Sequence, residues 1–459
     1  MQHGRFQLFL RTPERHPAAG LPTRSTSTGP FLASTPGSFQ KSAEAIDPSG
    51  NATVYAYTRD VLASITDSNG NVTGYAYDAH KRLTRTTFPD GATESYTYRP
   101  DGLLQTRTDR RGTVVTYSYD GLKRLTGKAY STGGSVTYGY TGQLLTGVTD
   151  TTVSPAETHS FTYDTSYRIS TATQASRGTL TYGYGPDDRV ASLAITAGPT
   201  ATYGYYPDGS PRTTTWSPVA GSFLWTYTPT GQYQALTFPN GQTHSYGYDD
   251  QGRLLQLSSS LGSTTLAAFS YGYDLDPASG LPTLLGQRTS QTVTLPAQGL
   301  SGAVTTYGYD SLYQLTRSQY PTGAPFSGES HQWAYDAIGN RLTASVNGTT
   351  RTYGYFKNAT NPLNGQRLQT DGTSTYSYDP AGNTTARTGS QSFTFGYDAD
   401  NRLSSIAGAE VATYTYDYQG RRTSKTSGGV TTTYLYDGLN LVAQTASGQT
   451  SYFLNGPGI

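Results

Sequence analysis

Aspartates followed by an arginine four positions later are the most regular polar pattern of the chain. The pairs are Asp78/Arg82, Asp120/Arg124, Asp164/Arg168, Asp249/Arg253 and Asp417/Arg421. A carboxylate beside a guanidinium could act as an acid/base site. It could equally cap a turn and form an ion pair beside it, and an exposed pair of this kind contributes only about 0–1 kcal/mol. Because residues repeated at every turn cannot all be catalytic, we interpret the pairs as structural.

The histidines show no pattern typical of a metal or catalytic site. They are His3, His16, His80, His159, His244 and His331, and no two of them have metal-ligand spacing. The chain also has no phosphate-binding Gly-Lys-Ser/Thr loop, nucleophile elbow or dinucleotide fingerprint. We therefore predict no catalytic, cofactor-binding or metal-binding residues, no cofactor and no enzymatic activity.

Five Asn-x-Thr triplets match the pattern for N-glycosylation. They begin at Asn51, Asn71, Asn347, Asn358 and Asn383. Asparagine is also a common turn residue, and Thr-rich runs follow these positions. We interpret the triplets as turns that enter strands.

A repeat must position all of these residues. Copies of an aromatic-x-Tyr unit begin at Tyr55, Tyr75, Tyr96, Tyr117, Tyr138, Phe161, Tyr182, Tyr203, Trp225, Tyr246, Tyr271, Tyr307, Trp333, Tyr353, Tyr376, Phe395, Tyr414 and Tyr434. The step is usually 19 to 23 residues. Such a period is typical of an array in which each unit buries its apolar face against its neighbours.

Each unit reads as two short antiparallel strands and two turns. Tyr75 and Tyr77 fall on one face of an extended strand, and the alternating run 82–88 reads as the return strand. Between them, the clearest copies have Asp first and Gly fourth, which is typical of a type I turn. These copies are Asp249–Gly252, Asp379–Gly382 and Asp417–Gly420. A second turn, such as Pro89-Asp90-Gly91, leads into the next unit.

The number of units predicts the overall architecture. Eighteen units give roughly 36 strands, which at about 4.8 Å per strand form on the order of 170 Å of antiparallel sheet. Sheets twist, and open sheets rarely exceed about 10 strands without curling. We therefore predict an all-β fold of tandem hairpins whose continuous sheet coils into a hollow spiral shell or large barrel that encloses a cavity.

Composition supports this fold and excludes several partners. The 459 residues include 40 Tyr and 53 Gly but few aliphatic residues, so stability must come from cross-strand tyrosine contacts. The net charge of +1 and the 14% of charged residues give no reason to expect nucleic acid as a partner. Absence of cysteine excludes disulfides. No run approaches the roughly 20 apolar residues of a membrane helix, so we expect no membrane insertion.

We expect two regions along the chain. Residues 1–43 are rich in Pro, Ser and Thr and are predicted to be disordered, and Phe6–Leu10 is too short for the apolar segment of an export signal. Residues 44–459 form the repeat array. A longer insertion at about 275–306 separates the copies at Tyr271 and Tyr307, and we expect a long hairpin or a degenerate unit there.

The tyrosines offer an alternative function. Rings exposed at regular intervals could stack on sugars, whereas packed rings would only stabilise the sheet. Sugar-binding repeats usually rely on tryptophan, and the chain has only Trp216, Trp225 and Trp333. Small residues between the paired tyrosines, such as Gly183 and Gly247, are better explained by rings that lean over bare backbone or by close approach of another layer.

The repeated Tyr-x-Tyr-Asp followed by Gly, Arg and Leu, as in 246–254, resembles the YD repeat of the Rhs (rearrangement hot spot) proteins. Wall-associated proteins, toxin-complex subunits and teneurins share this repeat, and the resemblance covers about nine tenths of the chain. It implies a β-spiral shell that, in many bacterial members, encloses a toxic C-terminal domain. Residues 434–459 resemble the segment before the family's core region, so we expect the chain to be truncated before that core.

In the family, the core region uses aspartates for self-cleavage, and an Asp-Pro signature marks it. Asp47-Pro48 and Asp379-Pro380 resemble that signature, but both lie at ordinary repeat positions, so we interpret them as turns.

The resulting hypothesis is a non-catalytic shell, secreted or at the bacterial cell surface, that encloses or scaffolds a C-terminal toxin or other cargo for export or contact-dependent delivery. Its partners would be that cargo, absent from this chain, and the secretion machinery. The alternative is a cell-surface adhesion or carbohydrate-binding repeat protein with glycans as partners.

Overall fold

Thr-rich and aromatic runs form short strands throughout the computed structural model, which describes residues 40–274, 286–323, 328–356 and 366–454. The first coil begins with β1 (Gln40–Ile46), β2 (Ala52–Thr58), β3 (Val61–Thr66), β4 (Val72–Tyr77), β5 (Leu83–Thr87), β6 (Thr93–Tyr98), β7 (Leu104–Thr108), β8 (Val114–Tyr119), β9 (Leu125–Tyr130), β10 (Ser135–Thr141), β11 (Leu144–Asp150), β12 (Glu157–Tyr163), β13 (Ile169–Gln174), the 3₁₀ helix η1 (Ala175–Arg177) and β14 (Gly178–Tyr184).

The remaining strands of this sheet are β15 (Val190–Ile195), β16 (Thr200–Tyr205), β17 (Pro211–Trp216), β18 (Val219–Tyr227), β19 (Tyr233–Thr237), β20 (Gln242–Tyr248), β21 (Leu254–Leu261), β22 (Thr264–Tyr273), β23 (Arg288–Leu295), the 3₁₀ helix η2 (Pro296–Gln298), β24 (Leu300–Tyr309), β25 (Leu315–Gln319), β26 (Ser330–Tyr335), β27 (Arg341–Val346) and β28 (Thr349–Thr352).

The second sheet contains β29 (Gly354–Tyr355), β30 (Leu368–Thr370), β31 (Thr375–Tyr378), β32 (Thr384–Thr388), β33 (Phe393–Tyr397), β34 (Leu403–Gly408), β35 (Ala412–Tyr416), β36 (Arg422–Ser427), β37 (Val430–Asp437), β38 (Asn440–Ala446) and β39 (Gln449–Tyr452).

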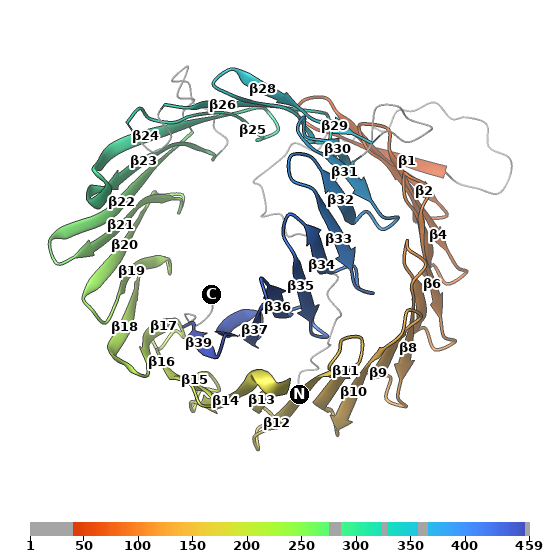
Figure 1. The fold of residues 1–459 in the computed structure, drawn as a ribbon, viewed down its shortest axis with the longest axis horizontal. Coiled ribbons are helices and arrows are strands. Elements are labelled where there is room, and N and C mark those ends of the chain that lie inside the picture. Colours follow the sequence, from red (N-terminus) through yellow and green to blue (C-terminus); the bar gives the residue numbers. More distant parts are fainter. Residues whose placement is uncertain (1–39, 275–285, 324–327, 357–365, 455–459) are drawn as a thin grey trace.

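The predicted fold class is confirmed. The described residues hold 39 strands, against roughly 36 expected, and within each of two sheets every strand pairs antiparallel with the next one in chain order. The sheet differs from one uninterrupted ribbon because it divides into 28 and 11 strands. The division lies within the single segment 349–355, whose first half pairs with β27 and whose second half pairs with β30. The second sheet therefore begins where the first one ends, and the chain continues in the same direction of winding (Figure 1).

The predicted turn is present, with one further feature. The backbone N–H of Asp78 donates to the carbonyl of Arg82, the Lys81 N–H donates to the Asp78 carbonyl, and Lys81 has a φ of 60°. In other copies Gly252 takes this left-handed conformation, with a φ of 81°, which explains the preference for glycine at the fourth position. The strand register also shifts by one residue between Ala76 and Tyr77, which makes each such hairpin a type I turn with a β-bulge.

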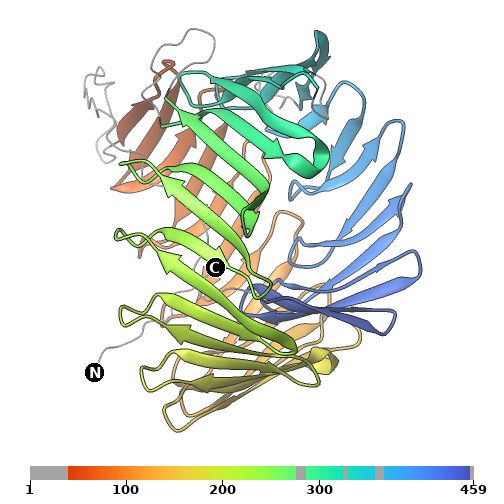
Figure 2. The ribbon, with the colours of Figure 1, turned by 90° about the vertical axis from the view of Figure 1, so that its left-hand side faces the viewer.

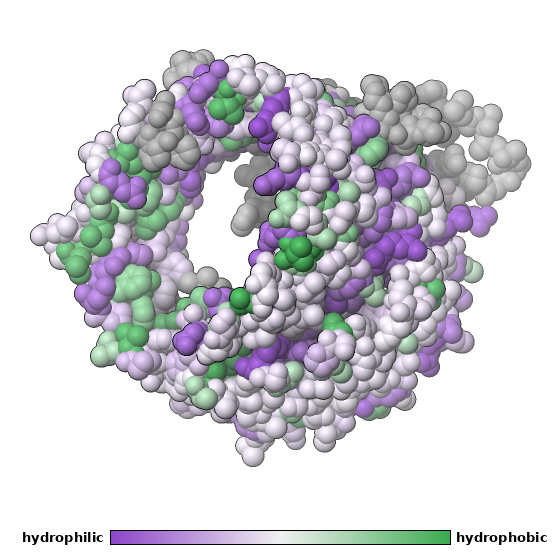
Figure 3. All heavy atoms as spheres, viewed as in Figure 1, coloured by the Kyte–Doolittle hydropathy of each residue, from purple (hydrophilic) through white to green (hydrophobic). Residues whose placement is uncertain are grey.

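The coiled shape is also as expected. Figure 1 shows β1–β28 running once around an open centre, after which β29–β39 continue as a second, incomplete coil inside the ring. Seen from the side, the second coil is displaced along the axis of the ring (Figure 2). The opening persists when all atoms are drawn (Figure 3). None of the described residues belongs to a helix long and apolar enough for a membrane span.

The expected regions of the chain are only partly described. Most of the predicted N-terminal region, residues 1–39, lies outside the described residues, and β1 extends across the expected boundary between 43 and 44. Within the expected insertion, residues 275–285 lie outside the described residues, and the rest forms β23, η2 and most of β24. β22 and β24 have 10 residues each, so this part of the array contains lengthened hairpin strands.

Candidate functional site

Each turn is joined to the next unit by a contact that we call the arginine–tyrosine clasp. In the unit of Asp78, the carboxylate accepts a 2.7 Å hydrogen bond from Nε of Arg82, and the Arg82 guanidinium lies 4.6 Å from the centre of the Tyr98 ring. The Tyr98 hydroxyl donates a 2.8 Å hydrogen bond back to the carbonyl of Leu83. The clasp thus ties the second tyrosine of one unit to the turn of the unit before it.

The clasp recurs around both coils. Fourteen second tyrosines donate to a carbonyl of the preceding hairpin at 2.7–3.0 Å: Tyr98, Tyr119, Tyr140, Tyr163, Tyr184, Tyr205, Tyr273, Tyr309, Tyr335, Tyr355, Tyr378, Tyr397, Tyr416 and Tyr436. In nine of these, a turn arginine stacks at 4.3–5.8 Å. These distances are those of cation–π contacts.

The clasp explains the Asp–Arg pattern without catalysis. Backbone N–H groups and the guanidinium of Arg82 lower the pKa of Asp78, and the same kind of contacts lower the pKa of Asp120. For Asp164, the side-chain hydrogen bond from Arg168 is the largest cause of a lowered pKa. A carboxylate held ionised in this way accepts hydrogen bonds but is a poor proton donor or acceptor near neutral pH.

The histidines lie apart from one another. His80 is exposed in a turn, His244 packs against Phe238, and Nε2 of His331 lies 3.0 Å from the Glu329 carboxylate. The described residues contain no group of three potential metal ligands. His3 and His16 lie outside the described residues.

The Asn-x-Thr and Asp-Pro motifs lie in turns. Asn51, Asn71 and Asn383 donate side-chain hydrogen bonds to the aspartate that opens their turn, and the Asn347 side chain accepts from the Ser330 N–H. Asn358 lies outside the described residues. Asp47-Pro48 and Asp379-Pro380 open turns that are closed by N–H groups of Gly50 and Gly382.

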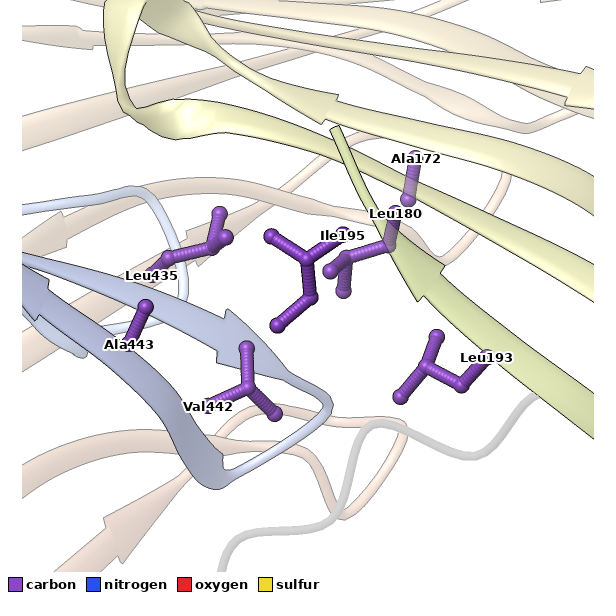
Figure 4. Close-up of a cluster of buried hydrophobic side chains, with 7 residues drawn as sticks. All are labelled: Ala172, Leu180, Leu193, Ile195, Leu435, Val442 and Ala443. Carbon is purple, nitrogen blue, oxygen red and sulfur yellow. The ribbon is translucent and has the colours of Figure 1, made fainter. Parts of the chain in front are cut away.

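A seam between the two coils is the main feature that sequence reasoning missed. Its apolar part is Ala172, Leu180, Leu193, Ile195, Leu435, Val442 and Ala443, all buried. In Figure 4 the side chains from β13–β15 point toward those from β37 and β38. A contact of this kind between coils removes apolar surface from water, which is the main favourable contribution to the free energy of folding.

The seam also shows which face of the sheet looks inward. Leu180 shares a face of β14 with Tyr182 and Tyr184, because side chains alternate along a strand. Figure 1 places β37–β39 on the inner side of β14–β16, and Leu180 packs on that second coil. The tyrosine face of the first coil is therefore the inner face. Leu435 lies between Tyr434 and Tyr436 and so belongs to the outer face of the second coil.

A sequence signal for the seam existed. The residue between the two aromatics is Gly, Ala, Ser or Thr in every other copy of the unit, and only the last copy has a leucine, Leu435. A large apolar residue on a face that is otherwise small and polar indicates a contact with another layer.

Polar contacts extend the seam around the ring. Asn69 contacts Asp336 at 3.0 Å, in the turn between β26 and β27, where the first coil comes round to its own start. Farther along, Arg111 donates to the Asp398 carbonyl of the second coil at 2.6 Å, and Gln174 contacts the backbone of Tyr436. These partners are 262 to 287 residues apart in sequence. One coil therefore takes about that length of chain.

Near β12 the seam contains ionisable side chains with little exposure to solvent. His159 is 3% exposed, with Nε2 3.3 Å from Glu157 and 3.9 Å from Asp417 of the second coil. Arg177 pairs with Glu157, and Arg421 pairs with Asp417. The Tyr418 ring lies edge-on to His159 at 5.0 Å. Glu157 and Asp417 thus each have an arginine partner, which compensates for the burial of their charge.

The tyrosine rings are mostly engaged within the sheet. Burial raises the pKa of Tyr96 and of Tyr203 to about 12. Rings also contact one another, as Tyr138 does Tyr418 across the seam at 6.0 Å. Sugar binding by exposed tyrosines stays a prediction that these contacts do not test.

Comparison with known families gives two matches. Residues 62–93 match the RHS Repeat model, and residues 113–279 match the Teneurin YD-shell model. The comparison with curated proteins found no match.

Solved structures share the fold at low sequence identity. A structure of the Photorhabdus luminescens Tc holotoxin pore aligns with a TM-score of 0.60 at 16% identity, over 88% of this chain and 25% of that chain. A TcdB2-TccC3-TEV structure aligns with a TM-score of 0.55 at 15% identity, over 86% and 25%, and a TcdB2-TccC3 structure with 0.55 at 14%, over 86% and 26%. The chain thus spans about a quarter of the length of these structures. The chain thus carries RHS-repeat and YD-shell sequence over the two matched segments, and it shares the β-shell fold of these Tc toxin structures.

Proposed function

We propose that the chain is a wall of a hollow shell that encloses a polypeptide cargo, a toxin domain, for export or contact-dependent delivery. The observation that carries the proposal is the sheet itself, which winds around an open centre and binds its second coil to its first (Figures 1 and 3). Within each sheet the strands pair continuously, so a folded protein could not pass between neighbouring strands. Exclusion by size, rather than catalysis by the wall, would protect the host cell.

The solved relatives support the proposal. They are a Tc holotoxin pore and TcdB2-TccC3 complexes, so this fold occurs in toxin assemblies. This chain covers about a quarter of their length. We therefore include the cargo and the secretion machinery as proposed partners. Action outside the producing cell, as a secreted or cell-surface protein, follows from the same reading.

Protease protection tests the proposal. An unstructured passenger peptide joined after Ile459 is expected to be cut at least several-fold more slowly than the same peptide free in solution. The matched control is the same fusion carrying Leu435→Asp, which places a charge in the apolar seam and should restore rapid cutting. Equal cutting of the free and the fused passenger, while the strands stay intact by circular dichroism, would overturn enclosure by this wall.

A further inference from the structure

Two consecutive units lack the arginine of the clasp. In the units that begin at Tyr203 and Trp225, the arginine position holds Ser210 and Gln232. Their backbone turns are otherwise ordinary, since the N–H of Tyr206 donates to the Ser210 carbonyl and the N–H of Thr228 donates to the Gln232 carbonyl. These two units therefore differ from the others in the side chains of the turn, not in its backbone.

A cavity of about 520 Å³ lies where the two guanidinium groups are missing. Its walls include Tyr205, Tyr227, Tyr233, Tyr248, Pro211 and Gln232. Tyr227 and Tyr248 are the second tyrosines that arginines at positions 210 and 232 would cover. The volume is within the range of about 300–1,000 Å³ that is usual for ligand sites.

Two tyrosines of this cavity, Tyr227 and Tyr248, have uncovered rings. Across the part of the chain that the structure describes, no arginine stacks on either of them, whereas Arg189 lies 5.5 Å from the ring of Tyr205, a third wall of the cavity, and Arg253 lies 4.7 Å from the Tyr273 ring of the next unit. The Tyr227 hydroxyl is buried without a hydrogen-bond partner. A hydroxyl oxygen can accept from an N–H, and a ring face attracts a cation.

Absence of an arginine alone does not open the clasp. Gln314 and Asn340 also replace the arginine, yet the following tyrosines still donate to the preceding hairpin: Tyr335 to the Leu315 carbonyl at 2.7 Å and Tyr355 to the Arg341 carbonyl at 3.0 Å. Gln232 instead donates to the Gly252 carbonyl at 2.8 Å, which leaves the Tyr248 ring uncovered.

The cavity has a carboxylate beside its uncovered rings, and its other end is already occupied by the Arg189 guanidinium against Gly209 and Tyr205. Burial, then Tyr233, Tyr206 and the Asp208 carboxylate, raise the pKa of Tyr227 to about 12, so this phenol stays neutral while a carboxylate stands nearby. The rings of Tyr227 and Tyr233 lie 5.3 Å apart and tilted by 32°, which presents two aromatic faces in one place. Like Tyr184, the cavity tyrosines Tyr205, Tyr227 and Tyr248 are the second aromatic residues of their units. Because Tyr184 lies on the inner face of the first coil, the cavity opens on that face.

We propose that this cavity binds an arginine side chain of a polypeptide inside the ring, in the place that the chain's own arginines fill in neighbouring units. The planar guanidinium can stack on a tyrosine face and donate to the free Tyr227 hydroxyl at once, which a lysine ammonium cannot do as well. The site requires only access to the inner face, so it holds whether or not the shell protects a cargo.

The test measures binding of three capped tripeptides, Gly-Arg-Gly, Gly-Lys-Gly and Gly-citrulline-Gly, to the full chain. Fluorescence reports binding, because the Trp225 ring lies 5.5 Å from the Tyr233 ring. We expect the arginine peptide to bind, the lysine peptide to bind at least tenfold more weakly and the neutral citrulline peptide not to bind measurably.

A variant that restores the clasp gives the decisive comparison. Thr228→Asp with Gln232→Arg rebuilds the Asp–Arg pair and covers Tyr248 from within, so the arginine peptide should bind at least tenfold more weakly. Gln314→Arg completes the same Asp–Arg pair with the existing Asp310 in a distant turn and should leave binding unchanged. If the double variant does not fold, as judged by circular dichroism, Ser210→Arg covers Tyr227 instead and replaces it.

Three results would overturn the proposal. They are failure of the arginine peptide to bind the parent chain, equal binding of the citrulline peptide, and undiminished binding to the clasp-restored variant. Binding of neutral oligosaccharides that is abolished by the same variant, without arginine binding, would assign the cavity to glycans instead.

Discussion

Left-handed residues at the fourth position of the turn are the clearest local cost in this sequence. Tyr167 has a φ of 64° and is 76% exposed, so its side chain contributes little while its backbone is strained. A non-glycine residue in this conformation costs roughly 1–2 kcal/mol, and glycine loses about 0.5–1 kcal/mol of chain entropy. We expect Tyr167→Gly to stabilise the protein by about 0.5–1 kcal/mol, measured as a shift in the denaturant midpoint.

Tyr167→Ala is the control, because alanine removes the ring but keeps the strain. If alanine raises the midpoint as much as glycine does, the loss of an exposed ring rather than the backbone conformation is responsible, and the strain account fails.

At the same scale, the sequence predicted the turn but not the clasp. Asp249 and Gly252 are required by the turn's own geometry, which is local and can be read from spacing. The hydrogen bond from Tyr98 to the Leu83 carbonyl joins different hairpins, so it depends on the twist between them. Spacing alone shows that Tyr96 and Tyr98 share a face, not which carbonyl the hydroxyl reaches.

At the scale of elements, hairpins were predictable and their bulges were not. The pairing of β4 with β5 shifts between Ala76 and Tyr77, although the aromatic alternation in the sequence is undisturbed. The extra residue lies beside the turn, where the left-handed residue forces it. Because a bulge increases local twist, its repetition in successive hairpins helps the sheet to curl.

Leu435 allows the seam to be tested as an element. We expect Leu435→Thr, which gives the last unit the residue found at Thr415, to cost about 2–5 kcal/mol at the contact, since a buried leucine is truncated and a hydroxyl is buried. Hydrogen exchange of β14, β15, β37 and β38 should accelerate, while β4–β7 stay protected.

Leu439→Thr is the matched control, because Leu439 follows in the same hairpin but is 67% exposed. It should leave exchange at the seam unchanged. Unaltered exchange in Leu435→Thr would show that the polar contacts, such as that of Arg177 with the Tyr434 carbonyl at 2.7 Å, hold the coils together without the apolar cluster.

For the whole molecule, the sequence predicted that the sheet coils but not the radius of the coil. The strand count requires a sheet too wide to stay flat. Which units meet depends on the sum of many small rotations, so contacts such as Asn69 with Asp336, 267 residues apart, have no local signal. The division of the array into coils therefore emerged only from the structure.

Alkaline titration tests the tyrosine wall as a whole. Burial, the largest cause, raises the pKa of Tyr96, Tyr203 and Tyr418 to about 12 and raises the pKa of Tyr130 and Tyr182 further. A group whose pKa is raised in the folded state contributes stability that is complete below its unfolded pKa of about 10 and is lost as pH rises through the folded value. We expect the thermal midpoint to be insensitive to tyrosine ionisation up to about pH 10 and to fall steeply between about pH 10 and 12.

Tyrosinate absorbance and the circular dichroism of the strands should then change together, because the rings cannot ionise until the wall opens. Full ionisation near pH 10 with the strands intact would show that the rings are open to solvent and that packed tyrosines do not hold the shell.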